Sequence, residues 1–530
     1  MNMSIHSPER VRILDRLLAR DDRLLLILLA ITVLFVSFYN LEMFPRTWLD
    51  EGWHLQMPKN LVLYGKYATL SFEGSPIFTP TFAREMPTVF FPIALVFKLF
   101  GVGLFQARLV MALYLVLAVL AVYLVTSHVY DRKTAILAAF LFLLATYSQD
   151  PSASPLFLGR QVMGEVPAFF FFLIGCLLWF KAFDSACLPL LSFSGLCFGL
   201  AILTKSWFAF LIWPTMAVVW LADVVYYQRL GFRHFAVPFL LSVISILAWV
   251  ALLYFILGPE DFATHSAVVR SASSTSVALF SLRRALSGIK FLISSDFLIW
   301  GLSGLIYAAV LALDKQKRAL TAFHLLAFTA VSLTWYVFVS IAWGRYAFPV
   351  FAVANVFVAK LIRDLSGGFD LGKLRAAVNQ RNGLDLVRQL GVTLVLVFFV
   401  ISSFARTIEQ ITTADDDAPQ RFADYIDTHL NQNVLIETVE WEISFLTRHS
   451  LYHHPPPTVM DALTMHAYLD APYSSDLYDF QKYDPDYVVV GIIAKWWTEL
   501  YPPDFLAQEC TLVKSIGDYD LYRVNVREEK

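Results

Sequence analysis

The chain has 530 residues, of which 58% are hydrophobic and only 16% are charged, whereas a soluble domain carries roughly 25% charged residues. This composition excludes a soluble globular protein and predicts a polytopic membrane protein. The formal charge of −2 hides an asymmetry, because residues 1–406 carry 33 Lys and Arg against 21 Asp and Glu, and residues 407–530 carry 8 against 22. We therefore expect a helical membrane domain over residues 1–406 and a soluble domain over residues 407–530. The basic residues stand singly between apolar segments, which argues against nucleic acid as a partner.

Apolar segments in chain order predict about eleven transmembrane helices. Their cores are expected at residues 24–43, 106–128, 134–149, 166–180, 188–203, 207–222, 235–257, 291–313, 319–341, 347–362 and 389–406. If the N-terminus is cytoplasmic, the inner loops hold 19 Lys and Arg in 81 residues and the outer loops hold 12 in 120. The positive-inside rule therefore predicts a multi-pass protein of the inner or plasma membrane, with a cytoplasmic N-terminus and an extracytoplasmic C-terminal domain.

Two outer segments differ from simple loops. The first outer loop, residues 44–105, contains the short apolar segment 87–100, in which Pro92 and Lys98 argue against a membrane crossing. We expect an interfacial helix there, lying on the outer surface. The outer segment 258–290 is polar and rich in serine, which is typical of either a lid over a site or a long loop with an amphipathic helix.

The C-terminal segment changes character and predicts a small α/β domain. Residues 423–430 have a helical pattern, and residues 433–439, 487–491 and 511–517 have strand patterns. Turn signals separate them at residues 453–457 and 517–520. Nothing in this segment indicates an active site of its own.

The most informative local pattern is a pair of adjacent carboxylates, Asp50 and Glu51, shortly after the first apolar helix. Trp48, Trp53 and His54 flank the pair. Aromatic walls desolvate a carboxylate and raise its basicity, so the pair could hold a cation or supply a general base. The alternative is a solvated helix start, where acidic residues in the first turn stabilise the helix dipole.

Five sequence elements occur in an order that resembles a known enzyme group. They are Asp50-Glu51 with Gly65, then Pro87 with Leu99-Phe100-Gly101 and Ala107-Arg108, then Gly159-Arg160 with Glu165 and Pro167, then Gly199 to Trp207, and finally Gly344-Arg345-Tyr346. The series is similar to that of the GT-C superfamily of membrane glycosyltransferases. Specifically, it resembles glycosyltransferase family 39, the group of protein O-mannosyltransferases and aminoarabinose transferases.

This resemblance implies an inverting glycosyltransferase that takes a sugar from a polyprenyl-phosphate donor. The acceptor would be a lipid, a glycan or a protein at the outer face of the membrane. By the same resemblance, Asp50 is the candidate catalytic base and Glu51 is its neighbour in the catalytic site. A transporter or flippase of lipid-linked sugars is an alternative function, and an inactive family member that serves as a binding scaffold is another.

The phosphate of such a donor needs fixed positive charge, and two isolated cations could supply it. Lys205 and Arg345 lie at the predicted outer ends of apolar helices, where a cation needs an anionic partner or exposure. The alternative is that both side chains extend to lipid headgroups. The family's aminoarabinose transferases have a lysine where this chain has Met86, and Arg84 is the candidate substitute for that phosphate contact.

Five further residues are predicted to line the substrate pocket. They are His54, Glu85, Arg160, Glu165 and Tyr346. Glu165 occupies the position where the family usually has an aspartate, although a helix N-terminal acid is an equally simple interpretation. Asp50 and Glu165 could also share a divalent metal ion with the phosphate, and the sequence does not decide whether one is required.

Overall fold

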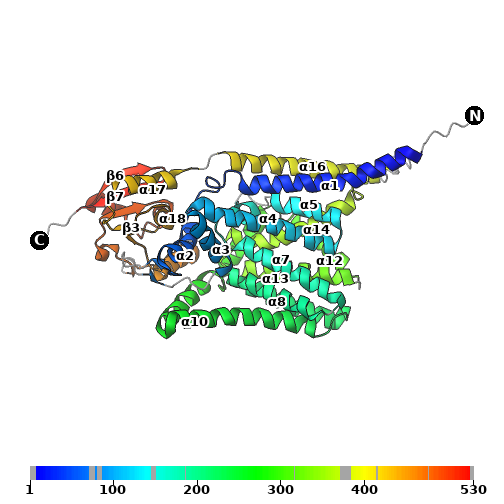
Figure 1. The fold of residues 1–530 in the computed structure, drawn as a ribbon, viewed down its shortest axis with the longest axis horizontal. Helices are drawn as coiled ribbons and strands as arrows, with labels where there is room; N and C mark the ends of the chain where they lie inside the picture. Colours follow the sequence, from blue (N-terminus) through cyan, green and yellow to red (C-terminus); the bar gives the residue numbers. More distant parts are fainter. Residues whose placement is uncertain are drawn as a thin grey trace, which may run out of the picture.

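The computed structural model describes residues 8–70, 78–79, 86–144, 151–185, 187–295, 297–314, 317–370, 383–413, 416–474 and 477–525. Figure 1 shows an elongated molecule with a helical bundle at one end and a small domain that contains a sheet at the other. The N-terminus projects from the far end of the bundle, and the C-terminus projects from the small domain.

The bundle is built almost entirely from helices. In chain order its elements are α1 (Pro8–Phe38), α2 (Leu49–Tyr64), β1 (Thr69–Leu70), β2 (Phe78–Thr79), α3 (Pro87–Phe100), α4 (Leu104–Val129), α5 (Arg132–Leu144), η1 (Pro151–Ala153), α6 (Pro155–Arg160), α7 (Glu165–Ser185), α8 (Leu188–Thr204), η2 (Ser206–Phe208), α9 (Ala209–Ala222), η3 (Asp223–Tyr227), α10 (Arg233–Ser276), α11 (Leu282–Ser294), α12 (Gly301–Ala312), α13 (Lys317–Phe338), η4 (Gly344–Ala347), α14 (Phe348–Leu365) and α16 (Gly383–Thr412).

Within the described residues, seven helical segments are long and apolar enough to cross a membrane. They are Leu104–Val129, Glu165–Phe183, Ser206–Tyr227, Arg233–Ser276, Ala319–Phe338, Gly344–Leu365 and Gly383–Thr412. Because the hydrocarbon core cannot satisfy exposed backbone groups, such segments cross it as helices. The protein is therefore a multi-pass membrane protein, while the count of eleven crossings and their orientation stay predictions.

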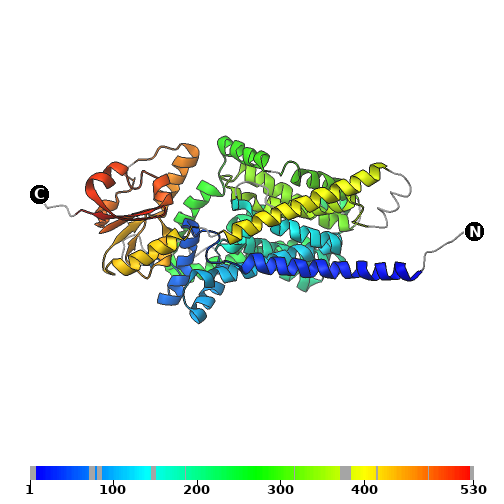
Figure 2. The same cartoon turned by 90° about the horizontal axis from the view of Figure 1, so that it is seen from above.

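Helices α1 and α16 run along the same side of the bundle in Figure 1. Figure 2 shows that they converge toward the small domain and diverge at the other end. At the converging end, the Nδ2 of Asn40 donates a hydrogen bond to the carbonyl of Ile411 over 3.0 Å. The first and last long helices of the bundle are thus joined where the chain enters the small domain.

One predicted helix, over residues 291–313, is wrong as a single element. Helix α11 ends at Ser294 and α12 begins only at Gly301. The hydroxyls of Ser294 and Ser295 donate to the carbonyls of Phe291 and Leu292 over 3.0 and 2.8 Å. Such side-chain bonds compete with helix continuation, and Ser295 has an extended backbone.

The segment 258–290, which was predicted to be an outer loop, is helical over most of its length. Helix α10 continues through a kink at Gly258, where φ is +78°, and runs on to Ser276. Its part beyond the kink packs against α19 (Pro457–Leu469) of the small domain, and Ser271 donates to the Oδ2 of Asp461 over 2.5 Å. The segment forms helices that connect the two parts of the molecule, and its action as a lid stays a prediction.

The small domain contains a five-stranded mixed sheet with the order β4-β3-β5-β7-β6. Its remaining elements are α17 (Ala418–His429), β3 (Ile436–Thr438), α18 (Trp441–Leu446), β4 (Tyr452–His453), η6 (Phe480–Tyr483), β5 (Tyr487–Val490), α20 (Ile492–Trp496), α21 (Pro503–Glu509), β6 (Cys510–Ile516) and β7 (Tyr519–Val524). Strands β4, β3 and β5 are parallel, and β7 is antiparallel to both β5 and β6. We call this unit the sheet domain.

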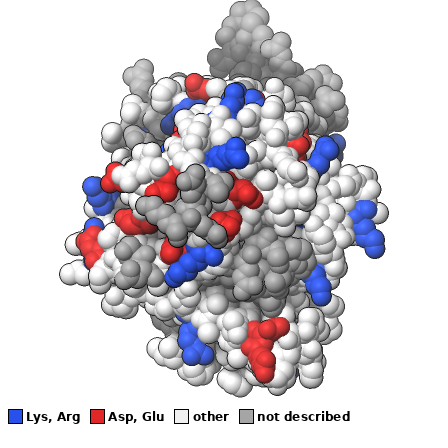
Figure 3. Space-filling model, turned by 90° about the vertical axis from the view of Figure 1, so that its left-hand side faces the viewer, with Lys and Arg blue, Asp and Glu red and all other residues white. Residues whose placement is uncertain are grey.

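The sheet domain confirms the α/β character that was expected for the C-terminal segment. The predicted helix and three strands correspond to α17, β3, β5 and β6, whereas β4 and β7 were not predicted. Helix α16 also runs past the expected boundary at residue 406, to Thr412. The end of the molecule formed by this domain presents acidic and basic side chains, as Figure 3 shows, which is what an aqueous surface requires.

Candidate active site

Helix α2 carries the predicted acidic pair and begins at Leu49, directly after Trp48 in extended conformation. Asp50 and Glu51 lie in its first turn, where negative charge is stabilised by the helix dipole. The helix ends at Tyr64 and is followed by Gly65, whose φ of +66° is a left-handed conformation that favours glycine. The two carboxylates have different partners, Arg345 for Asp50 and Arg108 for Glu51.

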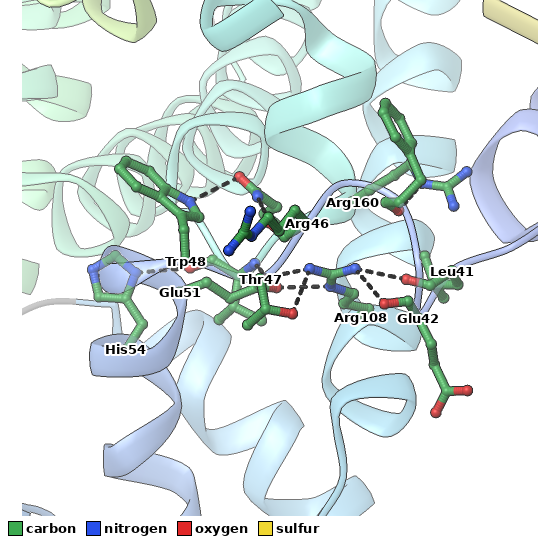
Figure 4. Close-up of polar contacts among 12 residues, drawn as sticks. Leu41, Glu42, Arg46, Thr47, Trp48, Glu51, His54, Arg108 and Arg160 are labelled. Carbon is green, nitrogen blue, oxygen red and sulfur yellow. Dashed lines mark hydrogen bonds and ion pairs between the residues drawn. The ribbon is translucent and has the colours of Figure 1, made fainter. Parts of the chain in front are cut away.

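Glu51 is fully buried and forms a two-pronged ion pair with Arg108 of α4. The Nε of Arg108 donates to Oε1 over 2.9 Å, and its Nη2 donates to Oε2 over 2.6 Å. The backbone N–H of Val162 also donates to Oε1 over 3.1 Å, and Arg108 reaches the carbonyls of Leu41 and Glu42 (Figure 4). This geometry favours a structural role for Glu51 over its expected place beside the catalytic base.

Arg160 also has a different environment from the one that was expected. It is completely buried, and its guanidinium donates to the carbonyls of Val36, Tyr39, Asn40 and Phe44 over 2.5 to 3.0 Å. These carbonyls belong to the end of α1 and the chain just beyond it, where a helix leaves acceptors unsatisfied. The contacts favour a capping role for Arg160 over a substrate-binding role.

Asp50 forms an ion pair with Arg345 through its Oδ2 and the Nη1 of the arginine. Arg345 lies in η4, directly before α14. The two side chains are 20% and 15% exposed, so both reach a surface from which a ligand could approach. The guanidinium also lies over the rings of Trp343 and Tyr346, 4.8 and 5.7 Å from their centroids. These rings fix the plane of the guanidinium.

Glu165 forms a second ion pair, with Lys205, in which Oε1 and Nζ are 3.8 Å apart. Glu165 is fully buried at the start of α7, and neither carboxylate oxygen has a hydrogen-bond partner in the described part of the chain. A Cβ atom on the preceding residue, Gly164, would lie 2.7 Å from the Cε of Lys205 and 2.6 Å from the sulfur of Met86. A side chain at this position would therefore require Lys205 and Met86 to shift.

These four charged residues form one electrostatic cluster, which we call the charge cluster: Asp50, Glu165, Lys205 and Arg345. Burial alone would raise the pKa of Asp50, but the charges of Arg345, His54 and Lys205 bring it below its usual value. Asp50 is therefore ionised at neutral pH. Glu165 in turn interacts electrostatically with Arg345, so two anions and two cations are brought together from distant parts of the sequence.

His54 and Tyr346 border the charge cluster. The Nδ1 of His54 lies 2.7 Å from the carbonyl oxygen of Val162 (Figure 4). A carbonyl only accepts, so this bond places a hydrogen on Nδ1. Tyr346 is buried and its ring packs against Trp207, Trp335 and Trp343. Their expected contact with a substrate stays a prediction.

Arg84 and Glu85, two further predicted site residues, lie outside the described residues. The described ranges contain no group of three or more His, Cys, Asp or Glu side chains arranged to hold a metal ion. Asp50 and Glu165 are each paired with a cationic side chain. A shared metal ion at these carboxylates therefore stays a prediction without a further protein ligand to support it.

The sheet domain also contacts α2, on a face that carries Gly52 and Gln56. A Cβ atom on Gly52 would overlap the backbone of Glu442 in α18, so only glycine permits this approach. The Nε2 of Gln56 donates to the hydroxyl of Ser444 over 2.9 Å. The Nζ of Lys59 donates to three carbonyls at the end of α18, over 2.9 to 3.1 Å. Helix α2 is thus fixed between the bundle and the sheet domain.

Sequence reasoning did not predict the roles of Arg108, Gly52 and Trp343. Arg108 was part of the family-like pattern, but only the structure shows that it binds Glu51. Gly52 follows the acidic pair directly, and a glycine inside an apolar helix start is a known signal of close packing. Trp343 precedes the Gly344-Arg345-Tyr346 element, and an aromatic residue beside an isolated arginine is a signal for ring stacking.

Comparison with known proteins shows a family match over part of the chain. Residues 84–255 match the dolichyl-phosphate-mannose-protein mannosyltransferase family. A protein of Aquifex aeolicus (strain VF5) is 24% identical over 237 residues, which are 44% of this chain and 45% of that protein. The sequence match thus spans less than half the length of either protein.

Solved structures match over nearly the whole chain. ArnT from Cupriavidus metallidurans, bound to undecaprenyl phosphate, has a TM-score of 0.64 and 14% identity over 95% of this chain and 98% of its own. An oligosaccharyltransferase of Archaeoglobus fulgidus, tethered to an acceptor peptide, has a TM-score of 0.59 and 14% identity over 96% and 74%. The protein therefore has the GT-C glycosyltransferase fold and resembles the group of protein mannosyltransferases and ArnT.

Proposed function

We propose that the protein is an inverting glycosyltransferase that moves a sugar from a polyprenyl phosphate to a lipid, glycan or protein acceptor at the outer face of the membrane. The observation that carries this proposal is the partly exposed ion pair of Asp50 and Arg345, with Lys205 close by. It offers an ionised base and two cations in one place. ArnT bound to undecaprenyl phosphate and AglB bound to dolichol phosphate share the fold.

The reaction needs a base at the acceptor and positive charge at the leaving group. Asp50 takes the proton from the acceptor hydroxyl, and the acceptor oxygen attacks the anomeric carbon of the sugar on the face opposite the phosphate. The bond between that carbon and the phosphate oxygen breaks, and its electron pair leaves with the polyprenyl phosphate. Attack from the opposite face inverts the configuration at this carbon.

Through Arg345, binding of the donor changes the basicity of Asp50. In the free site its guanidinium neutralises Asp50 and keeps the pKa of that carboxyl low. A donor phosphate competes for the same guanidinium, and its negative charge grows as the glycosidic bond breaks. Asp50 then loses part of its counter-charge and becomes a stronger base. Lys205, held by Glu165, supplies the second cation for the phosphate.

The position of the charge cluster favours an enzyme over a transporter or flippase. Asp50 and Glu165 lie at the starts of α2 and α7, Lys205 directly follows α8, and Arg345 directly precedes α14. A transporter is expected to place such groups on broken helices near the middle of the membrane. The remaining alternative, an inactive scaffold, differs from the enzyme only in turnover.

The test is a donor panel. The purified protein in nanodiscs is incubated with radiolabelled polyprenyl-phosphate sugars and a membrane extract as acceptor, and Asp50→Asn serves as the control. We expect one donor to be consumed, with the variant slower by at least about a hundredfold, the scale of a lost general base. If the unaltered protein consumes no donor with any extract, the enzyme proposal is wrong.

A further inference from the structure

Three aromatic side chains lead from the charge cluster onto the sheet domain. Trp343 lies under the guanidinium of Arg345, whose central carbon is 4.8 Å from the ring centroid. The ring of Tyr468 in α19 lies 6.0 Å from that of Trp343, and the ring of Trp496, the last residue of α20, lies 5.8 Å from that of Tyr468. We call Trp343, Tyr468 and Trp496 the aromatic row. It begins on the bundle and ends on the sheet domain.

The aromatic row is continuous with the charge cluster. The hydroxyl of Tyr468 lies within electrostatic reach of both Asp50 and Arg345. Trp343 and Tyr468 are partly exposed, and so are the side chains of Asp50 and Arg345. A molecule that places a hydroxyl at Asp50 can therefore extend along the row without displacing any of these side chains from the core.

Trp496, at the far end of the row, is exposed and held in place. Its side chain is 51% exposed, whereas the neighbouring Trp497 is buried in the core of the sheet domain. The two rings are stacked, with centroids 5.3 Å apart and planes 19° from parallel. Trp497 thus supports Trp496 from below. An exposed tryptophan in a fixed orientation is typical of a surface that binds another molecule.

Polar groups accompany the aromatic row. The guanidinium of Arg284 in α11 lies 4.9 Å from the ring centroid of Tyr468, and its Nε donates to the carbonyl of Ile341 over 2.7 Å. Two further polar contacts involve residues two positions from Tyr468: Arg283 with Asp470, and His466 with Glu499. Aromatic faces and hydrogen-bonding groups are thus combined along one path.

This combination favours a saccharide over a hydrocarbon chain or a peptide. A hydrocarbon chain on the row would remove water from polar groups such as Arg284 without replacing their hydrogen bonds. An extended peptide is usually bound through the edge of a sheet, whereas Tyr468 and Trp496 are presented by helices. A sugar ring has an apolar C–H face that packs on aromatic rings, and its hydroxyls form hydrogen bonds with polar groups beside them.

We propose that the aromatic row binds a saccharide acceptor, with the reacting hydroxyl at Asp50 and the following sugar units on Tyr468 and Trp496. This inference rests on the proposed function and selects a glycan among the lipid, glycan and protein acceptors. Tyr468 and Trp496 are then the residues through which the sheet domain determines acceptor specificity. Neither touches the reacting atoms.

The first experiment measures binding without a donor, so its result does not depend on turnover. The full chain in nanodiscs is titrated calorimetrically with mannotetraose, maltotetraose and chitotetraose, with empty nanodiscs as the blank. We expect at least one tetrasaccharide to bind, and its monosaccharide to bind at least about tenfold more weakly, because a single unit stacks on fewer rings. A hexapeptide of serine and threonine should not bind.

Trp496→Ala is the decisive variant, because an exposed side chain can be removed without opening the core. It should weaken tetrasaccharide binding at least about fivefold, the scale of one lost aromatic contact. Leu512→Ala, at a residue of β6 that is 53% exposed in the same domain, is the matched control and should bind normally. Tyr468→Phe keeps the ring and should retain binding, whereas Tyr468→Leu should lose it.

Transfer gives the second experiment. With the donor that the protein consumes, Trp496→Ala should raise the acceptor KM at least about fivefold and change kcat less than about twofold, because the row acts away from the reacting atoms. Donor consumption without binding of any tetrasaccharide, or unchanged binding by Trp496→Ala, would overturn this inference and leave the proposed function standing. Quenching of tryptophan fluorescence by brominated phospholipid that disappears in Trp496→Ala would assign Trp496 to the lipid surface and would also overturn it.

Discussion

Gly52 of α2 and Glu442 of α18 approach so closely that a Cβ atom on the glycine would overlap the backbone nitrogen of the glutamate. On a neighbouring face of α2, Glu51 is bound to Arg108 in the bundle. Asp50 therefore belongs to a helix turn that both the sheet domain and the bundle hold in place. The position of its carboxylate depends on how the sheet domain docks as much as on the membrane helices.

Gly52→Ala should separate α2 from α18, because the added methyl meets backbone atoms that cannot rotate away. We expect a loss of about 1–3 kcal/mol in the free energy of unfolding and a drop in transfer rate of at least about tenfold. Thermal unfolding and donor turnover measure the two effects. Gly391→Ala in α16 is the matched control, since a Cβ there meets nothing within 4 Å. Equal behaviour of the two variants would contradict the docking role.

The two neighbouring carboxylates should respond in opposite ways to loss of charge. Glu51→Gln leaves the buried guanidinium of Arg108 without its counter-charge, which costs about 3–5 kcal/mol of stability. Asp50→Asn, at a partly exposed pair, should preserve the unfolding temperature and abolish most of the transfer. Unfolding curves and single-turnover rates of both variants check the contrast. If Glu51→Gln is stable but inactive, Glu51 has a catalytic role and not a structural one.

The ion pair of Asp50 also determines the pH dependence. Asp50 must be ionised to act as a base, so activity is lost as the pH falls through its pKa. Because Arg345, His54 and Lys205 hold that pKa below the usual value, kcat/KM should not decline on account of Asp50 between pH 7 and pH 5. In Arg345→Ala the guanidinium no longer counteracts the burial that raises the pKa of Asp50. The acid limb of the kcat/KM profile should therefore move to higher pH. An unmoved limb would exclude Asp50 as the titrating base.

Arg345 offers a test of transition-state stabilisation. Arg345→Lys keeps the charge but loses the planar fork and its stacking on Trp343, so it should still impair transfer. Arg345→Ala should lower the single-turnover rate more than it weakens donor binding, because the charge of the phosphate grows during the reaction. Lys205→Ala should show the same pattern more mildly. Equal losses of rate and affinity would mean that Arg345 serves ground-state binding only.

Much of the helical framework could be predicted from the sequence because hydropathy records which segments cross a membrane. The break after Ser294 was missed, although Ser294 and Ser295 are residues whose hydroxyls can end a helix. In the sheet domain, β4 has only two residues, too few for an alternating pattern. Strand β7 begins at Tyr519, inside a segment that was interpreted as a turn.

The candidate site could be predicted only as a set of residues and not as an arrangement. Asp50 and Arg345 are 295 positions apart, and local patterns contain no information on contacts at that range. Glu51 looked equivalent to Asp50 because adjacent residues in a sequence share the same flanking pattern. They differ in the structure because successive helical positions face different directions, one toward Arg108 and one toward Arg345.

The parallel strands of the sheet domain end in chain segments that meet the rest of the protein. Strand β3 leads into α18, which packs on α2, and β5 leads through Gly491 into α20, whose Ile492 and Ile493 line a cavity together with Phe44 and Trp48. In open α/β sheets the carboxyl ends of the strands are where ligands bind. Here the segment that follows the carboxyl end of β3 binds α2, a helix of the same chain, in the place where other sheets bind a ligand. The orientation of the proposed base, Asp50, then depends on how the sheet domain binds α2. The sheet domain does this although it contributes no residue to the charge cluster.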